Sequence, residues 1–196
     1  MEGLETAMEL KAVVYFDKPG EENTDEAFRI AKERARELGI NTVIVASTRG
    51  NNAAKAVDFF NGMKVVVVSH VTGRREPNVQ ELTDENRQKI ESKGGVVVTT
   101  AHAFMGVEAA MSKKFVNMQL FGGVIAATLR IFGQGMKVVC EIALMAADAG
   151  QVRTDEEVIA IAGTTRGADT VVVLTPVNSK DFFDIRVKEI LCKPRF

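Results

Sequence analysis

Short apolar runs of strand length recur along the chain, and most of them end in a polar loop. They lie at residues 12–16, 42–46, 65–68, 96–99, 158–162 and 171–174. Continuous runs of Val, Ile and Ala of this length are typical of strands that are buried on both faces of a sheet. Segments with apolar residues at helical spacing separate the first four runs. This alternation predicts an α/β fold with a mainly parallel sheet covered on both sides.

The helical segments carry start and stop signals. Asn23, with Glu26 three residues later, resembles an N-terminal capping box, and Gly39 ends the helix that follows. Further helices are predicted at residues 52–60, 83–93, 107–113, 124–132 and 136–149. The last is apolar almost all round, so we expect it to be deeply packed, with Glu141 and Asp148 on its more exposed face.

The C-terminal part of the chain departs from this alternation. Only residues 163–170 separate the last two apolar runs, whereas parallel neighbours need a crossover of about a dozen residues or more. These two strands are therefore predicted to be antiparallel. A final strand at 183–191 alternates apolar and charged positions, which predicts one wet face, as on a sheet edge. No linker interrupts the pattern, so residues 1–196 are interpreted as one domain.

Composition narrows the classes of function. The 25 basic and 26 acidic residues give a net charge of −1, without the basic excess of a general nucleic-acid binder. No run approaches the roughly 20 apolar residues of a membrane span, and residues 1–10 lack the pattern of a signal peptide. Cys140 and Cys192 lie far apart in apolar surroundings, as reduced core thiols do. We expect a cytoplasmic protein with neither nucleic acid nor a membrane as partner.

The most informative feature is an internal echo at two strand ends. One apolar run leads into Ser47, Thr48, Arg49 and Gly50, and another leads into Gly163, Thr164, Thr165, Arg166 and Gly167. Ligands of open α/β sheets bind outside the carboxyl ends of the strands, and the first copy also opens a helix whose free N–H groups favour an anion. Hydroxyls and arginine donate to phosphate oxygens, and glycine permits close backbone approach. The echo favours a phosphate site.

Two further strand ends carry similar residues. The run at 65–68 is followed by Ser69, His70, Thr72, Gly73, Arg74 and Arg75, the run at 96–98 by Thr99, Thr100 and His102, and Asn51 and Asn52 follow Gly50. The only carboxylates in these loops are Glu76 and Asp169, so we expect a hydroxyl-rich and cationic cleft. The opposing interpretation is that these Ser, Thr, Asn and Gly residues only cap helices and form turns.

Both histidines follow strand ends, which makes His70 and His102 candidates for acid–base catalysis near neutral pH, with a hydrogen-bonded structural role as the alternative. The chain has no phosphate loop ending in Gly-Lys-Ser/Thr, no dinucleotide glycine fingerprint, no zinc-ligand spacing and no nucleophile elbow. These absences disfavour a nucleoside triphosphatase, a standard dinucleotide dehydrogenase, a metalloprotease and an α/β-hydrolase. We expect no bound metal.

The segments 41–52, 132–150 and 163–170 resemble a small, mostly archaeal family of uncharacterised proteins similar to the C-terminal α/β domain of pyruvate kinase. The resemblance extends to Phe182-Phe183-Asp184 and Lys193-Pro194-Arg195. It implies a three-layer α/β/α sandwich whose five-strand sheet has the order 3-2-1-4-5, with an antiparallel last strand, and we expect one extra edge strand.

The same resemblance bears on the ligand. In pyruvate kinase the comparable loop after the first strand binds the phosphate of a sugar-phosphate activator, and Ser47, Thr48, Arg49 and Gly50 fall on it. Asn51 and Asn52 depart from the kinase pattern. Pyruvate kinase chemistry belongs to a separate barrel domain, so no pyruvate kinase activity is expected. The resemblance further implies flavin mononucleotide (FMN) as an occupant of the cleft.

Three functions stay open from the sequence. The first is a binding protein that senses or carries a phosphorylated small molecule such as FMN. The second is an enzyme, either a flavin-dependent oxidoreductase or a phosphate-transfer or hydrolysis catalyst that uses His70 or His102. The third is a subunit of a homo-oligomer, for which the wet last strand would supply part of the surface.

Overall fold

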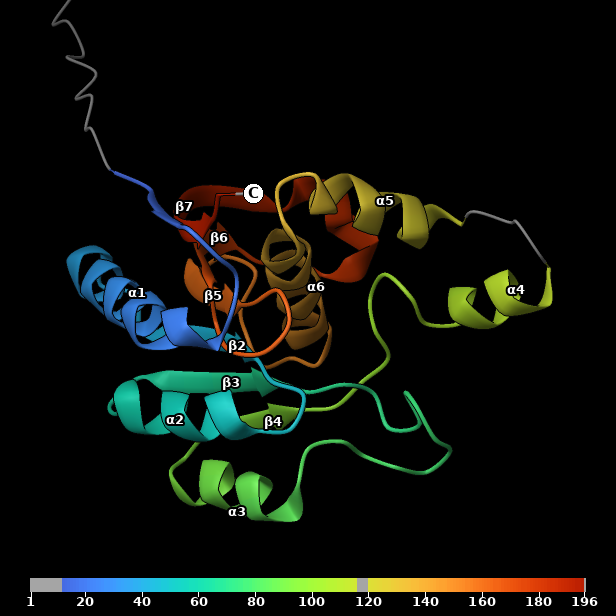
Figure 1. Ribbon diagram of the computed structural model, residues 1–196, viewed down its shortest axis with the longest axis horizontal. Coiled ribbons are helices and arrows are strands. Elements are labelled where there is room, and N and C mark those ends of the chain that lie inside the picture. The colour runs from blue at the N-terminus through green and yellow to red at the C-terminus, as the bar shows by residue number, and fades with distance from the viewer. Residues whose placement is uncertain (1–11, 116–119, 196) are drawn as a thin grey trace, which may run out of the picture.

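Seven strands form one sheet in the computed structural model, which describes residues 12–115 and 120–195 (Figure 1). Segment 1–10, considered above for a signal peptide, lies outside the described residues. The strands are β1 (Val14–Phe16), β2 (Thr42–Ala46), β3 (Lys64–Val68), β4 (Val96–Val98), β5 (Val158–Ala162), β6 (Thr170–Thr175) and β7 (Arg186–Pro194). The helices are α1 (Thr24–Leu38), α2 (Asn51–Phe59), α3 (Asp84–Ser92), α4 (Glu108–Lys114), α5 (Phe121–Arg130) and α6 (Gln134–Asp148), with 3-10 helices at Glu21–Asn23 and Ser179–Asp184.

The helices cover the sheet as two separate layers, which confirms the predicted α/β/α sandwich. Residues of α1, α2 and α3 share one buried cluster, and residues of α5 and α6 share the other. Figure 1 shows α1 and α6 on opposite sides of β5 and β6, while α4 projects from the body of the molecule. No side chain of α4 is buried.

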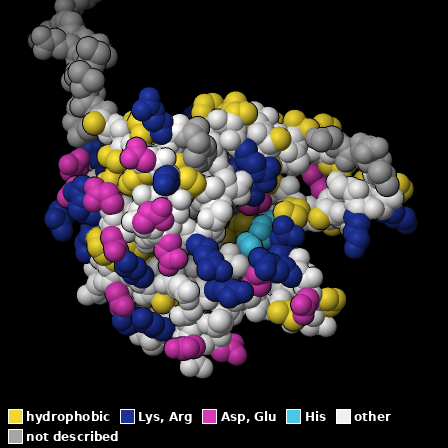
Figure 2. Space-filling model, in the orientation of Figure 1, with side chains coloured by type: hydrophobic (Ala, Val, Ile, Leu, Met, Phe, Trp, Pro, Cys, Tyr) yellow, Lys and Arg dark blue, Asp and Glu magenta, His cyan; other side chains and the backbone are white. Residues whose placement is uncertain are grey.

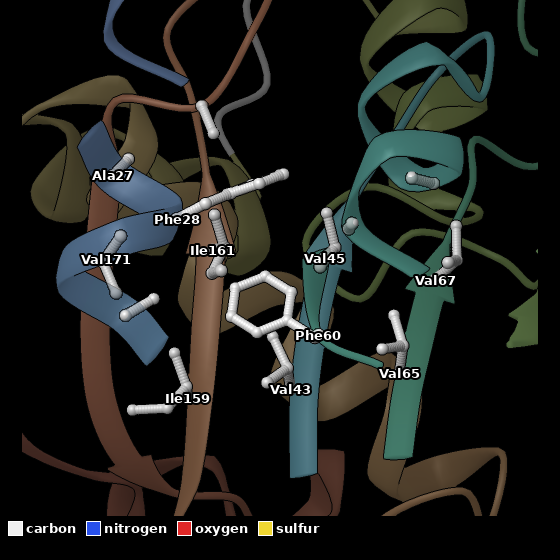
Figure 3. Close-up of a cluster of buried hydrophobic side chains, with 14 of the residues drawn as sticks. Ala27, Phe28, Val43, Val45, Phe60, Val65, Val67, Ile159, Ile161 and Val171 are labelled. Atoms are coloured by element: carbon white, nitrogen blue, oxygen red, sulfur yellow. The ribbon is translucent and has the colours of Figure 1, made fainter. Parts of the chain in front are cut away.

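Alternation along each strand supplies both clusters. In β2, Val43 and Val45 face the α1/α2 layer, whereas Ile44 between them faces α6. The same division holds in β3, β5 and β6, and Figure 3 shows the α1/α2 side of this packing around Phe28 and Phe60. Strands that are buried on both faces have continuous apolar sequences, which is why the apolar runs predict the positions of these strands well.

The strand order positions a cleft. The sheet runs β1-β7-β6-β5-β2-β3-β4, and only β6 is antiparallel to its neighbours. Counted from β2, the segment β4-β3-β2-β5-β6 has the predicted order 3-2-1-4-5 with an antiparallel last strand. The chain moves from β2 outward to β4 and then returns to the other side of β2 with β5, so the switch point lies between β2 and β5. Open α/β sheets bind their ligands at such a point.

The prediction of one extra edge strand is wrong, because two strands extend the sheet beyond β6. β7 pairs antiparallel with β6, and β1 pairs in parallel with the last residues of β7. The predicted start of the last strand is also wrong: Phe183 and Asp184 belong to a 3-10 helix, and the strand begins at Arg186. A hydrogen-bonded cap supports that helix, since Asp148 accepts from the backbone N–H of Ser179 at 3.0 Å.

Two local predictions also need correction. Asn23 stands at the N-terminus of α1, but its side chain donates to the Lys18 carbonyl and caps nothing. Glu141 is not on an exposed face of α6, because only 3% of its surface is accessible. The helical spacing sets both carboxylates of α6 apart from its apolar residues and so predicts a solvent-exposed position for them. In the structure the Glu141 side chain instead points into a buried polar cleft.

The two cysteines are buried in different layers. Cys140 of α6 belongs to the α6-side cluster, and Cys192 of β7 belongs to the α1/α2-side cluster. Burial raises the pKa of the Cys140 thiol to about 11 and that of Cys192 to about 12. Both are free thiols. Among the helices of the described residues, none has the length and apolarity needed to cross a membrane.

Candidate functional site

A cavity of about 690 Å³ opens at the carboxyl ends of β2, β3 and β5, at the switch point of the sheet. Loops after these three strands and one side of α6 form its walls. Figure 2 shows histidine side chains in a hollow of the surface, with Lys and Arg side chains gathered around it. The cavity therefore lies where the strand order and the strand-end residues both predict a ligand.

The loop after β2 leads directly into α2. Thr48, Arg49, Asn51 and Asn52 all line the cavity. Gly50 adopts φ 100° and no side chain caps the helix, so the first N–H groups of α2 face the loop without a side-chain acceptor. Gly50 itself does not line the cavity. A Cβ there would lie 2.5 Å from Cβ of Asn86, so its lack of a side chain permits close packing of α2 on α3.

The loop after β5 forms the opposite wall. Gly163, Thr164, Thr165, Arg166 and Gly167 all line the cavity. Asp169, which sequence analysis placed among the cleft carboxylates, is fully buried and does not line it: it accepts from the Thr164 N–H at 3.1 Å and from the Thr170 hydroxyl at 2.8 Å. The buried Oγ1 of Thr164 has no hydrogen-bond partner among the described residues.

His70 is held between a carboxylate and a hydroxyl. Its Nδ1 lies 2.7 Å from Oε2 of Glu81, and its Nε2 lies 3.4 Å from Oγ1 of Thr48. The hydrogen bond from His70 lowers the pKa of Glu81 below its ordinary value, against the effect of burial, and the positive charge of Arg75 lowers it further. Glu81 is therefore ionised near neutral pH, and His70 presents Nε2 to Thr48.

His102 belongs to a second, more deeply buried cluster. Its Nδ1 lies 3.7 Å from Oε2 of Glu141, and its Nε2 accepts from the Val71 N–H at 3.4 Å. Lys137, one turn earlier on α6, forms an ion pair with Glu141. Burial raises the pKa of Glu141, but His102 and Lys137 outweigh it and lower the value to about 2. The two imidazole rings lie 5.2 Å apart between centroids.

Most of the predicted residues meet at this cavity, and some do not. Those that line it are Ser47, Thr48, Arg49, Asn51, Asn52, Ser69, His70, His102, Gly163, Thr164, Thr165, Arg166 and Gly167. Those outside its lining are Gly50, Thr72, Gly73, Thr99 and Thr100. Two of these five support residues that line it: Thr99 shares a 2.6 Å hydrogen bond with Ser69, and the Thr72 hydroxyl accepts from Gln80, whose amide also binds the His70 carbonyl.

Sequence reasoning missed the polar stripe of α6 and the carboxylates of the cleft. Gln134, Lys137 and Glu141 recur at spacings of three and four on an otherwise apolar helix, and that spacing was the signal that could have found them. Glu81 gave no such signal, because a loop brings it to His70 from eleven residues away. The expectation of a cleft whose nearby carboxylates are only Glu76 and Asp169 is therefore wrong.

The fold and the cavity define an open-sheet α/β/α domain with its cleft at the strand switch point. The family model described as pyruvate kinase, alpha/beta domain, matches residues 25–174. The chain belongs to the pyruvate kinase α/β-domain family.

Two solved structures are also similar to the chain. A pyruvate kinase from Cryptosporidium parvum is 13% identical, with a TM-score of 0.40, over 78% of this chain and 23% of its own. Cryptosporidium parvum pyruvate kinase in complex with ADP is 12% identical, with a TM-score of 0.38, over 76% of this chain and 22% of its own. The chain thus spans less than a quarter of the length of either enzyme.

Proposed function

We propose that the cavity binds a phosphorylated small molecule, with its phosphate between the loops after β2 and β5. The observation that carries the proposal is the convergence of two Thr-Arg-Gly loops on one cavity at the strand switch point. Arg49 and Arg166 make no ion pair among the described residues, so both guanidinium groups are available to an anion. The uncapped N-terminus of α2 adds backbone donors on the same side.

The charge of the lining supports an anionic ligand. Six basic side chains face three acidic ones, namely Arg49, Arg74, Arg75, Arg130, Lys137 and Arg166 against Glu21, Glu81 and Glu141. Two of the carboxylates are already engaged, Glu81 by His70 and Arg75 and Glu141 by Lys137. The excess positive charge therefore lies with the arginines at the rim, where a phosphate would enter.

FMN is the ligand we propose first. The cavity volume of about 690 Å³ falls within the roughly 300–1,000 Å³ usual for small-molecule sites. Val68, Val138, Ile142 and Met145 supply apolar wall for a flat ring, and the unpartnered Thr164 hydroxyl offers a polar contact. Arg49, Arg166 and the hydroxyls beside them would hold the phosphate. A bound flavin would supply redox chemistry that these side chains lack.

The test begins with a visible absorption spectrum of freshly purified protein and mass spectrometry of whatever heat releases. A flavin band and released FMN are expected. Titration with FMN should then show Arg49→Ala binding about 1.5–3 kcal/mol more weakly, the usual loss for a charged hydrogen bond. Arg87→Ala is the matched control, because Arg87 lies on α3, pairs with Glu91 and does not line the cavity.

Two results would contradict the proposal at different levels. A colourless protein that also fails to bind added FMN removes the flavin, and a sugar phosphate and a nucleotide would then be titrated in its place. Equal affinity of Arg49→Ala and the unchanged protein for every one of these ligands removes the phosphate site itself.

A further inference from the structure

Thr48, His70 and Glu81 form a hydrogen-bonded chain inside the cavity. Glu81 Oε2 lies 2.7 Å from Nδ1 of His70, and Nε2 of His70 lies 3.4 Å from the Thr48 hydroxyl oxygen. An ionised carboxylate accepts the Nδ1 proton, which leaves the Nε2 lone pair of a neutral imidazole to face the hydroxyl. A hydroxyl beside a base that is itself oriented by a third group is the arrangement of an activated nucleophile.

The side chain of Gln80 holds this hydrogen-bonded chain in place through backbone groups on both sides of it. The Gln80 side chain donates to the His70 carbonyl at 3.0 Å and accepts from the Leu82 N–H at 2.9 Å. These bonds anchor both neighbours of Glu81 beside His70. Only 11% of the Glu81 side chain is accessible.

The two histidines and the two echo loops are not equivalent. Both ring nitrogens of His102 face protein groups, Glu141 and the Val71 N–H, whereas Nε2 of His70 faces only a hydroxyl. Thr165 of the second loop has no histidine partner among the described residues. One copy of the echo therefore combines an anion-binding arginine with a base, and the other has the arginine alone.

We propose that Thr48 accepts a phosphoryl group from an acyl phosphate bound in the cavity, with His70 as general base and Glu81 as its positioning residue. Oγ1 of Thr48 attacks phosphorus as its proton passes to Nε2 of His70. The bond between phosphorus and the acyl oxygen breaks, and a carboxylate leaves with the electron pair. Arg49 and Arg166 would stabilise the charge on the transferring group. This inference rests on the proposed phosphate site, and it takes an acyl phosphate in place of FMN as the occupant of that site.

The geometry selects the substrate class. In phosphoryl transfer the attacking and leaving oxygens are roughly in line, on opposite sides of phosphorus. His70 stands beside the attacking oxygen and cannot protonate the leaving one, so the leaving group must depart without a proton, as the carboxylate of an acyl phosphate does. Water then attacks the phosphothreonine, Oγ1 regains its proton from His70, and inorganic phosphate is released while the second proton of the water goes to solvent.

Acetyl phosphate is the probe for the test. Incubated with it, the protein should gain the mass of one phosphoryl group, stable in acid and located on Thr48 by peptide mass spectrometry, and should release inorganic phosphate. Thr48→Val should abolish both signals and Thr48→Ser should retain them. His70→Gln should slow phosphate release by about 10²–10⁴-fold, the usual contribution of a general base. Circular dichroism checks that each variant is folded.

Glu81→Gln is expected to lower kcat for phosphate release and to leave the KM for acetyl phosphate nearly unchanged, because Glu81 orients His70 rather than binding the phosphoryl group. Glu81→Asp should restore part of the rate. Glu76→Gln, an exposed carboxylate of the same loop outside the cavity, should leave both constants unchanged. A purely structural role for Glu81 would lower the yield of folded protein without lowering kcat of the folded fraction.

Three outcomes would overturn the inference. An acid-labile adduct on His70 would make the imidazole, not Thr48, the acceptor. Phosphate release that survives Thr48→Val would exclude a phosphothreonine. Arg49-dependent ligand binding without adduct or phosphate release would remove the transfer step while leaving the proposed phosphate site in place, whereas loss of that binding as well would remove both.

Discussion

At the scale of single residues, the most consequential feature is the buried ion pair between Lys137 and Glu141. Their side chains are 7% and 4% exposed, and the pair sits four residues apart on α6. Burying a single charge costs several kcal/mol of folding free energy unless an opposite charge lies beside it. Each residue of this pair therefore offsets the cost of burying the other. The pair places two mutually compensating charges at the inner wall of the cavity.

Glu141→Gln should destabilise the fold by about 3–5 kcal/mol, because it leaves Lys137 buried without a counter-charge. Urea unfolding monitored by circular dichroism measures the difference. Glu33→Gln is the matched control: Glu33 pairs with Arg29 at the same spacing on α1, but both side chains are more than half exposed, and stability should hardly change. Equal effects of the two substitutions would show that burial does not govern the Glu141 pair.

The lowered pKa of Glu141 also determines how the stability of the fold changes with pH. The pKa of Glu141 is lowered from 4.5 to about 2 in the folded protein, so its contribution to stability is complete above its unfolded value. As the pH falls from about 4.5 towards 2, the carboxylate takes up a proton more readily in the unfolded chain and that contribution is lost. Unfolding curves at a series of pH values should therefore show a steeper acid loss for the unchanged protein than for Glu141→Gln.

At the scale of elements, the loop after β5 depends on a close approach to the start of α1. Gly167 has φ +82°, and a Cβ there would lie 2.3 Å from Cα of Glu21. The next residue, Ala168, donates its N–H to the Thr24 hydroxyl at 3.0 Å, which joins the loop to the helix. A wall of the cavity is thus fixed by a contact with an element more than 140 residues away along the chain.

Gly167→Ala should therefore cost more stability than the left-handed conformation alone explains. Gly150→Ala is the control, since Gly150 has φ +68° and nothing within 4 Å of the added methyl group. The control should lose about 1–2 kcal/mol, the penalty of that conformation, and Gly167→Ala a further roughly 1–3 kcal/mol from overpacking. Thermal unfolding compares the two, and equal losses would mean that the loop moves away from α1 freely.

Sequence patterns predict most elements, because in these elements the apolar periodicity and the end signals along the chain match the residues that the fold buries. β5 was bounded correctly, and the αL glycine after α1 ended that helix where expected. The failures lie where a distant partner decides. Phe183 alternates with its neighbours as a strand residue would, yet Asp148 of α6 fixes that segment as a 3-10 helix.

At the scale of the whole molecule, the site is a product of strand order. The loops after β2 and β5 are more than 100 residues apart in sequence and become neighbours because their strands pair in parallel. The echo of their sequences predicted that convergence. The polar spacing on α6 indicates Glu141 as a cleft residue, but the partner of His70 could not be predicted, because Glu81 reaches the cavity through a loop path that only the folded chain determines.

The burial of one cysteine in each helical layer makes the chain a natural reporter of its own partial unfolding. A thiol reagent can modify Cys140 only when the α6 layer opens, and Cys192 only when the layer of α1 and α2 opens. We expect no modification of the folded protein on the time scale of mixing, and slow modification of both thiols thereafter. Rates that coincide, measured by mass spectrometry at rising urea concentrations, would mean that the two layers detach from the sheet as one cooperative unit; faster labelling of either cysteine would identify the layer that opens first.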